Sequence, residues 1–145
     1  MMAAISFETY RVKKMLYLVN SNFDEAIRDI TLDTKSRANI EISESENEAS
    51  VMLYIRLGSK EKNDQPFFVE VELEGDFGYN KEDDDERLGF ENFLKSNALA
   101  ILFPYLRNIV SSLTLQANQF PAYMLPTINF AKVVNEASEV ELSQI

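Results

Sequence analysis

The chain has 145 residues, 46% of them apolar, and a formal net charge of −10. This length and composition predict one domain over residues 1–145 with its own core. The absence of cysteine and histidine excludes disulfides, thiolate nucleophiles, imidazole bases and Cys/His zinc sites within the chain. The negative charge disfavours nucleic acid as a partner. We find no signal-peptide pattern and no apolar run near 18 residues, and therefore expect a cytoplasmic protein without membrane insertion.

The first half of the chain alternates apolar and polar residues with the period of two that is typical of strands. We expect four strands within residues 5–77, of which the first, over residues 5–20, is rich in aromatic and β-branched side chains. In the third and fourth strands one face is aliphatic, whereas the other is polar or acidic. The pattern predicts an antiparallel sheet with one covered and one solvated face.

Helical spacing replaces the strand pattern after an acidic loop at residues 78–89. Apolar residues recur at steps of three and four through residues 90–117, which predicts a long main helix that covers the aliphatic face. Pro104 lacks a backbone donor, so we expect a kink or a restart near Phe103. The fold class is therefore α+β, a four-stranded antiparallel sheet with helices on one face.

The chain after the main helix is expected to form a crossover loop, 118–129, a shorter second helix, 130–139, and a frayed acidic tail, 140–145. Asn118 suits a left-handed helix stop, and Asn129 suits the first cap of the second helix.

No pattern in the sequence predicts catalysis, a metal or a cofactor. The densest charge run, KEDDDER at residues 81–87, lacks the glycine and the glutamate that an EF-hand loop requires, so we interpret it as a solvated loop. The four glycines do not form a phosphate-binding motif. We therefore expect a non-enzymatic protein without a cofactor.

The segment PAYMLPTINF, residues 121–130, is unusually apolar for a loop. It packs onto its own sheet as ordinary core, or it lines an exposed groove or an interface. One sheet face cannot hide all the large apolar groups of helix and loop together, which favours the second interpretation for the set as a whole.

Two separated blocks of this region resemble the SecB export-chaperone family. The first block is Ile101 to Tyr105 with Arg107, and the second comprises Phe120, Pro121, Leu125, Pro126, Asn129 and Phe130. The resemblance is specific because both blocks match with nearly the family spacing. It implies an ATP-independent holdase that binds unfolded or partly folded polypeptides, and a homotetramer built as a dimer of dimers.

The resemblance also implies roles for individual residues. A client groove would be formed by Phe77, Tyr105, Phe120, Tyr123, Met124, Leu125 and Phe130. An oligomer interface would be formed by Ile101, Phe103, Leu106, Ile109 and Leu113.

The family docks the SecA translocation motor on its acidic sheet face. Glu70 matches the fourth-strand glutamate of that site, and Glu72 and Glu74 extend the candidate partner surface. The first strand departs from the family pattern, because residues 16–20 (LYLVN) contain no acid.

These features predict a divergent SecB-like chaperone that serves preproteins or a dedicated client such as an antitoxin. Two alternatives remain open at this point. One is a non-catalytic oligomeric adaptor or structural protein, and the other is a binder of small apolar ligands.

Overall fold

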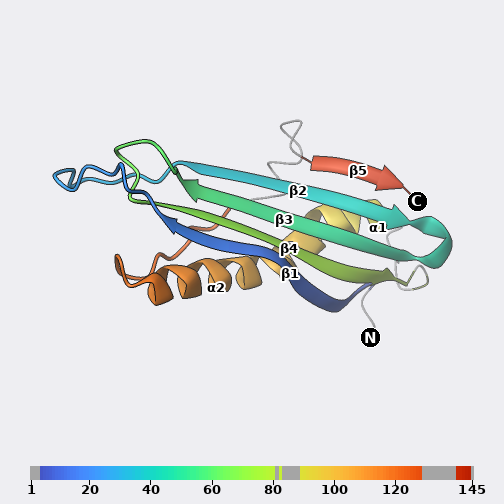
Figure 1. The fold of residues 1–145 in the computed structure, drawn as a ribbon. Coiled ribbons are helices and arrows are strands. Elements are labelled where there is room, and N and C mark those ends of the chain that lie inside the picture. The colour runs from blue at the N-terminus through green and yellow to red at the C-terminus, as the bar shows by residue number, and fades with distance from the viewer. Residues whose placement is uncertain (1–3, 81, 83–88, 129–139, 145) are drawn as a thin grey trace.

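The computed structural model describes residues 4–80, 82, 89–128 and 140–144, and its main element is a twisted sheet (Figure 1). Four antiparallel strands are present as predicted: β1 (Ile5–Val19), β2 (Thr34–Ser43), β3 (Glu48–Gly58) and β4 (Phe67–Tyr79). A short 3₁₀ turn, Glu44–Glu46, joins β2 to β3. Together with a fifth strand, β5 (Val140–Gln144), the four strands form one sheet in the order β1-β4-β3-β2-β5, which leaves β1 at one edge.

The two faces of the sheet differ as the alternation predicts. The side chains that point toward the helix are fully buried along β3 and β4, namely Val51, Leu53, Ile55, Leu57, Val69, Val71 and Leu73. Their neighbours point to the opposite side, which we call the outer face; this set includes Met52, Tyr54, Arg56, Phe68, Glu70, Glu72 and Glu74. The aliphatic face is covered and the outer face carries most of the charge.

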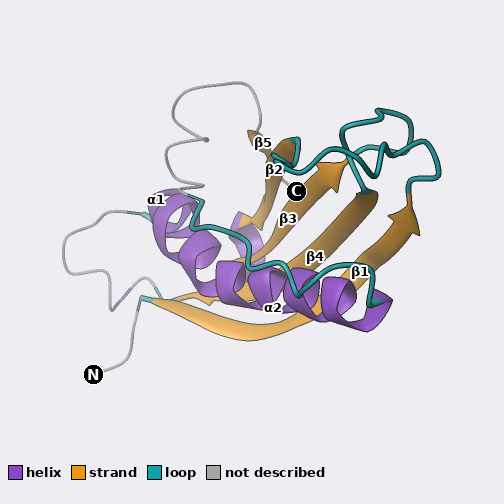
Figure 2. Ribbon diagram, turned by 90° about the vertical axis from the view of Figure 1, so that its left-hand side faces the viewer, coloured by secondary structure: helices purple, strands orange, loops and turns teal. Residues whose placement is uncertain are grey.

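One long helical segment covers the aliphatic face (Figure 2). It consists of α1 (Phe90–Phe93), a π-helical turn (Leu94–Ala98) and α2 (Leu99–Ala117). Leu94, Leu102 and Leu106 are fully buried against the sheet. Gly75 of β4 permits the close approach, because a Cβ atom at that position would lie 2.6 Å from Cδ2 of Leu102.

Of the predicted kink or restart near Phe103, the restart is wrong, because α2 continues through Pro104. Pro104 and Ala100, whose carbonyl loses its helical partner, are both exposed, so water can satisfy that carbonyl. The irregular turn lies upstream, at Leu94–Ala98. The predicted left-handed stop is confirmed: Asn118 has φ 54°, and its N–H donates to the Leu115 carbonyl at 3.2 Å.

The prediction for the end of the chain needs a correction. Residues 140–144, expected to be part of a frayed tail, form β5 (Val140–Gln144), which pairs in parallel with β2 from Ala38 to Ile42. Its sequence VELSQ begins with the apolar–polar alternation of a strand, and β2 would otherwise present an unpaired edge. The predicted second helix, 130–139, lies outside the described residues, as does most of the acidic loop.

The segment Phe90–Ala117 has the length and the mean hydropathy, 1.4, of a membrane-spanning helix, contrary to the sequence-based expectation that the chain lacks such a run. The core helices of soluble proteins share these properties. In this fold several apolar side chains of the segment, such as Leu94, Leu102 and Leu106, pack on the sheet, whereas Leu115 is 64% exposed.

Replacing Leu102 with alanine should lower the free energy of unfolding by about 3 kcal/mol, because a fully buried leucine is removed where the helix packs over Gly75 of β4. Leu115→Ala is the matched control on the same helix, since Leu115 is 64% exposed, and it should cost less than about 0.5 kcal/mol. Urea denaturation followed by circular dichroism measures both. Equal losses in the two variants would contradict the packing described here.

Candidate functional site

The crossover loop runs back along α2 and is tied to it by side-chain hydrogen bonds (Figure 2). The Tyr123 N–H donates to Oγ1 of the buried Thr114 at 2.8 Å. Further along, Arg107 donates from Nε to the Leu125 carbonyl and from Nη2 to Oγ1 of Thr127, each at 3.0 Å. These tethers fix the loop over about two turns of the helix, so its side chains have defined directions.

The loop divides its apolar side chains between core and surface. Leu125 is 1% exposed and belongs to the core, whereas its neighbour Met124 is 64% exposed. Tyr123 and Phe120 are half-buried, and the Phe120 ring packs between Phe67 and Phe23 with both centroids at 6.2 Å. The loop is therefore attached to the core through Leu125, while the side chain of Met124 faces the solvent.

The predicted groove residues do not all lie together. Phe77 is buried in the core like Leu125, so neither presents its side chain at the surface. Tyr105 is half-buried beside β1, with its ring 4.3 Å from that of Tyr10. Phe130 lies outside the described residues. The structure brings Phe120, Tyr123 and Met124 to one loop and places Tyr105 against the edge strand.

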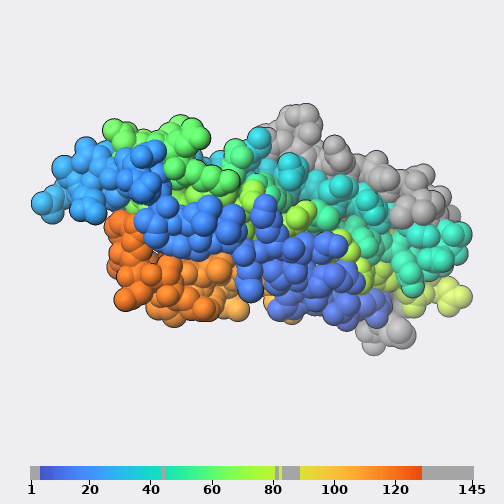
Figure 3. Space-filling model, viewed as in Figure 1, coloured from blue at the N-terminus to red at the C-terminus, as the bar shows by residue number. Residues whose placement is uncertain are grey.

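Sequence reasoning missed the exposed apolar side chains of β1. Tyr10, Val12, Met15 and Val19 lie opposite helix-facing residues of β4 and are 38–64% exposed. On the outer face Leu18 is 41% exposed. Figure 3 shows β1 at the surface beside the C-terminal part of α2. The available signal was the sequence MLYLV at residues 15–19, which has no polar alternation.

The helix residues predicted for an oligomer interface fall into two groups. Leu106 and Phe103 are buried in the core of the single chain, so they pack on their own sheet. Ile101, Ile109 and Leu113 are half-buried and retain some surface. Only the second group can contribute exposed area to a partner.

The predicted acidic surface lies on the outer face, but it is largely paired with bases of β1. Glu70 forms an ion pair with Lys14 and accepts a hydrogen bond from the Tyr54 hydroxyl. Arg11 binds Glu74 at 2.6 Å and Asp76 at 2.5 Å. Glu72 lies between, opposite Lys14 in the strand register.

These contacts shift two pKa values in opposite directions. The hydrogen bonds from Lys14 and then from Tyr54 lower the pKa of Glu70, although burial opposes the shift. Burial and then the bond to Glu70 raise the pKa of Tyr54 to about 12. The carboxylate is thus held in its charged form and the phenol in its neutral form.

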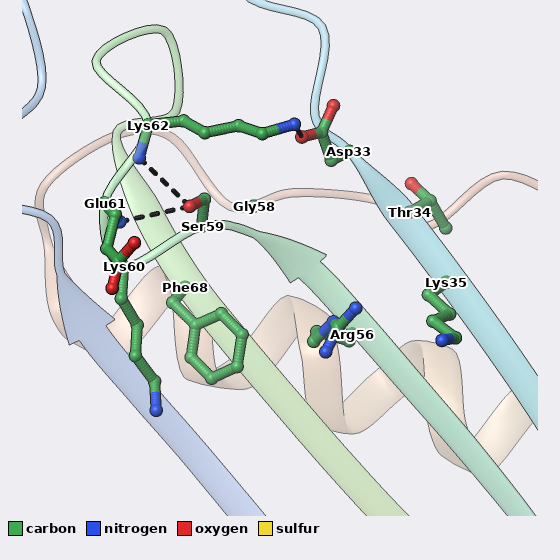
Figure 4. Close-up of a pocket in the computed structure, with 10 residues that line it drawn as sticks. All are labelled: Asp33, Thr34, Lys35, Arg56, Gly58, Ser59, Lys60, Glu61, Lys62 and Phe68. Atoms are coloured by element: carbon green, nitrogen blue, oxygen red, sulfur yellow. Dashed lines mark hydrogen bonds and ion pairs between the residues drawn. The ribbon is translucent and has the colours of Figure 1, made fainter.

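Two open cavities lie apart from the loop. One, of about 620 Å³, is lined by residues of β2, β3, β4 and the β3–β4 turn (Figure 4). The other, of about 780 Å³, is lined by acidic residues near the β2–β3 turn, including Glu41, Glu46 and Glu48. Within the described parts of the chain, no three acidic side chains are arranged to hold a metal ion.

Replacing Glu70 with glutamine should lower the free energy of unfolding at neutral pH by about 1 kcal/mol, because two hydrogen bonds to a charged carboxylate are weakened. The pKa of Glu70 is lowered in the fold, so its contribution is fully present above the ordinary value of 4.5 and is lost as the pH falls through the lower folded value. The difference between wild type and variant should therefore be constant above about pH 5.5 and shrink below pH 4.5.

Denaturant titrations at several pH values measure this difference. Glu25→Gln, at an exposed loop position, is the control and should show almost no difference at any pH. A difference that grows on acidification would contradict the pairing of Glu70.

The sequence of this chain is similar to those of known proteins. The family model described as "SecB: Preprotein translocase subunit SecB" matches residues 3–140. The "Uncharacterized protein MJ0357" of Methanocaldococcus jannaschii is 33% identical over 145 residues, covering 95% of this chain and 87% of that protein. The "Protein-export protein SecB" of Anaplasma phagocytophilum is 29% identical over 133 residues, covering 88% and 82%.

A solved structure has the same fold. The SecB-like chaperone Rv1957 of Mycobacterium tuberculosis, in complex with a ChAD peptide from the HigA1 antitoxin Rv1956, superposes with a TM-score of 0.65. The two sequences are 17% identical, and the match covers 86% of this chain and 91% of the other.

Proposed function

The chain belongs to the SecB family, and from that membership we propose that it is an ATP-independent holdase chaperone for unfolded or partly folded polypeptides. The proposal includes a cytoplasmic location and a non-catalytic role. It is supported by one observation above all: the crossover loop is pinned to α2 by Arg107 and Thr114 and yet exposes Met124.

The side chains of this loop are suited to binding clients of many different sequences. Methionine is flexible and polarizable, so it adapts to apolar segments of different shape. The neighbouring Tyr123 adds aromatic area, and Leu115 near the end of α2 is also 64% exposed. Because the loop is already ordered, less conformational entropy is lost when a client binds. We propose that clients lie along Tyr123 and Met124, with Phe120 beside them.

We propose two client classes, preproteins and a dedicated antitoxin. The first is suggested by the export protein of A. phagocytophilum, and the second by the antitoxin peptide in the M. tuberculosis complex. For the SecA motor we propose no stable docking on the Glu70–Glu74 surface, because Glu70 and Glu74 are paired with bases of β1.

The holdase proposal is tested by light scattering from a chemically denatured, aggregation-prone enzyme diluted into buffer without ATP. Near-stoichiometric protein should suppress the scattering. Tyr123→Ser combined with Met124→Ser should weaken the suppression by roughly tenfold in the required concentration, because two apolar contacts are removed. Leu18→Ser, an exposed change on the outer face, is the control and should act like the wild type.

Three outcomes would overturn the proposal. The first is absence of suppression for several clients. The second is unfolding or dissociation of the double-serine variant by circular dichroism or mass, which would favour an adaptor whose loop is structural. The third is displacement of a bound apolar dye by fatty acids but not by an unfolded polypeptide, which would favour a small-ligand binder.

We further propose that the chain forms a homo-oligomer, a tetramer built as a dimer of dimers. The support is the strand β1, which has no neighbour on its outer side among the described residues and which exposes its own side chains Val12, Met15 and Val19. Long apolar edges invite pairing with another chain unless they are protected. The half-buried Ile101, Ile109 and Leu113 supply further area on the helix.

Met15→Asp should shift the mass in solution to a smaller species, because a charge would be placed in the apolar contact at the strand edge. Met124→Asp is the matched control, since Met124 is similarly exposed on the loop, and it should keep the wild-type mass. Size-exclusion chromatography with light scattering gives the masses. A wild-type mass of 16.6 kDa would refute the oligomer, and an unchanged Met15→Asp mass would refute the role of β1.

A further inference from the structure

The 620 Å³ cavity on the outer face is basic, although the chain as a whole is strongly acidic. Four of its lining side chains are cations and two are carboxylates, which leaves a local excess of two positive charges. Figure 4 shows Lys35 and Arg56 on one side of the Phe68 ring and Lys60 on its other side. The lining cations are Lys35, Arg56, Lys60 and Lys62, and the carboxylates are Asp33 and Glu61. We call this site the basic cavity.

Two of these cations face each other as like charges on neighbouring strands. Lys35 of β2 lies directly opposite Arg56 of β3, and like charges in that relation destabilise a sheet. In the described part of the chain neither forms an ion pair. On the neighbouring strand β4, the residue opposite Arg56 is Glu70. Its carboxylate already forms an ion pair with Lys14 and accepts a hydrogen bond from Tyr54. A local conflict of this kind is typical of a functional surface.

The remaining lining residues combine charge with an apolar surface. The Lys60 ammonium lies over the Phe68 ring, 4.8 Å from its centroid. Phe68 is 7% exposed, so its ring is held in place and forms the apolar base of the basic cavity. Lys62 is paired with Asp33 at 2.8 Å, which closes one wall of the cavity.

The walls of the basic cavity are fixed by a buried polar network. Gln65, fully buried, accepts the Asp33 N–H at 2.9 Å and donates to the Thr31 carbonyl at 2.9 Å. Asn20, 3% exposed, donates to the carbonyl of Lys62 at 2.7 Å. The Ser59 hydroxyl accepts the N–H groups of Glu61 and Lys62 (Figure 4). Little ordering of the β3–β4 turn is therefore needed on binding.

We propose that the basic cavity docks an acidic peptide segment, in which carboxylates flank an aromatic or aliphatic side chain. A carboxylate can take both guanidinium donors of Arg56 with Lys35 beside it. The apolar side chain would lie on Phe68 and the Lys60 stem. This site is on the opposite face of the sheet from α2 and its loop, so the inference goes beyond the holdase proposal.

Charge also limits the kind of acidic partner. Screening confines the field of these cations to about 8 Å at physiological salt, so a short segment is attracted locally despite the net charge of −10. A nucleic acid strand would extend past the cavity onto Glu72 and toward the acidic cavity near the β2–β3 turn, where phosphates are repelled. A peptide can avoid this repulsion, because it can end before it reaches these acidic residues or carry uncharged residues there.

The test uses fluorescence anisotropy with a labelled peptide of about ten residues, made of Glu and Asp around a central Phe. The same peptide with Gln and Asn is the neutral control, and an oligodeoxythymidine of similar length represents nucleic acid. The full-length protein should bind the acidic peptide at least tenfold more tightly than the neutral one, and raising salt from about 0.05 M to about 0.3 M should weaken binding severalfold.

Variants locate the site. Arg56→Glu should weaken binding of the acidic peptide at least tenfold, because an attraction becomes a repulsion. Arg28→Glu is the matched control in an exposed loop and should change it less than about twofold. Amide chemical shifts of Ser59 to Lys62 should move on titration. A denatured client should not compete with the acidic peptide for the protein. Binding of the acidic peptide can therefore be judged independently of the holdase assay.

Equal binding of the acidic and neutral peptides would overturn the inference. An equal loss in Arg28→Glu would do the same, since it would reduce the effect to net charge. Tighter binding of the oligodeoxythymidine than of either peptide would assign the cavity to nucleic acid instead.

Discussion

The close packing of one long helical segment on the aliphatic face of the sheet is the contact on which the rest of the fold depends. It buries Leu94, Leu102 and Leu106 against β3 and β4, and the absence of a side chain at Gly75 leaves room for Leu102. Once this contact forms, the aliphatic face of the sheet is covered. Further surface for binding can come from the solvent-facing side of α2, from the loop after it, from the edge strand β1 or from the outer face.

The crossover loop shows how a loop can be both apolar and fixed in place. Its backbone is held by polar side chains of α2, and Leu125 is the only fully buried side chain from Phe120 to Leu125. The polar tethers leave Met124 free to face outward, while Phe120 and Tyr123 are half-buried against the core. A loop held by its apolar groups alone would have hidden them, which would remove the area that a chaperone needs.

Regular elements could be predicted from the sequence because their patterns are local. The strand faces, the main helix and the left-handed Asn118 follow from periodicity and backbone preference. Placement of single residues could not be predicted in this way. Leu125 and Met124 are adjacent in a loop without a period, so nothing local indicates which one is buried. β5 was missed because its partner, β2, is about one hundred residues away in the chain.

Charge on the outer face shows a second limit of reasoning from single positions. Glu70 matches the family pattern, but the properties of a carboxylate depend on what surrounds it. Here Lys14 and Tyr54 occupy Glu70, and Arg56, one strand away, has no carboxylate partner in the described part of the chain. The sequence predicts that Glu70 is part of an acidic surface, but in the fold it lies next to the basic cavity. Because screening makes such effects local, a few substitutions on neighbouring strands can reverse the preferred partner without disturbing the core beneath.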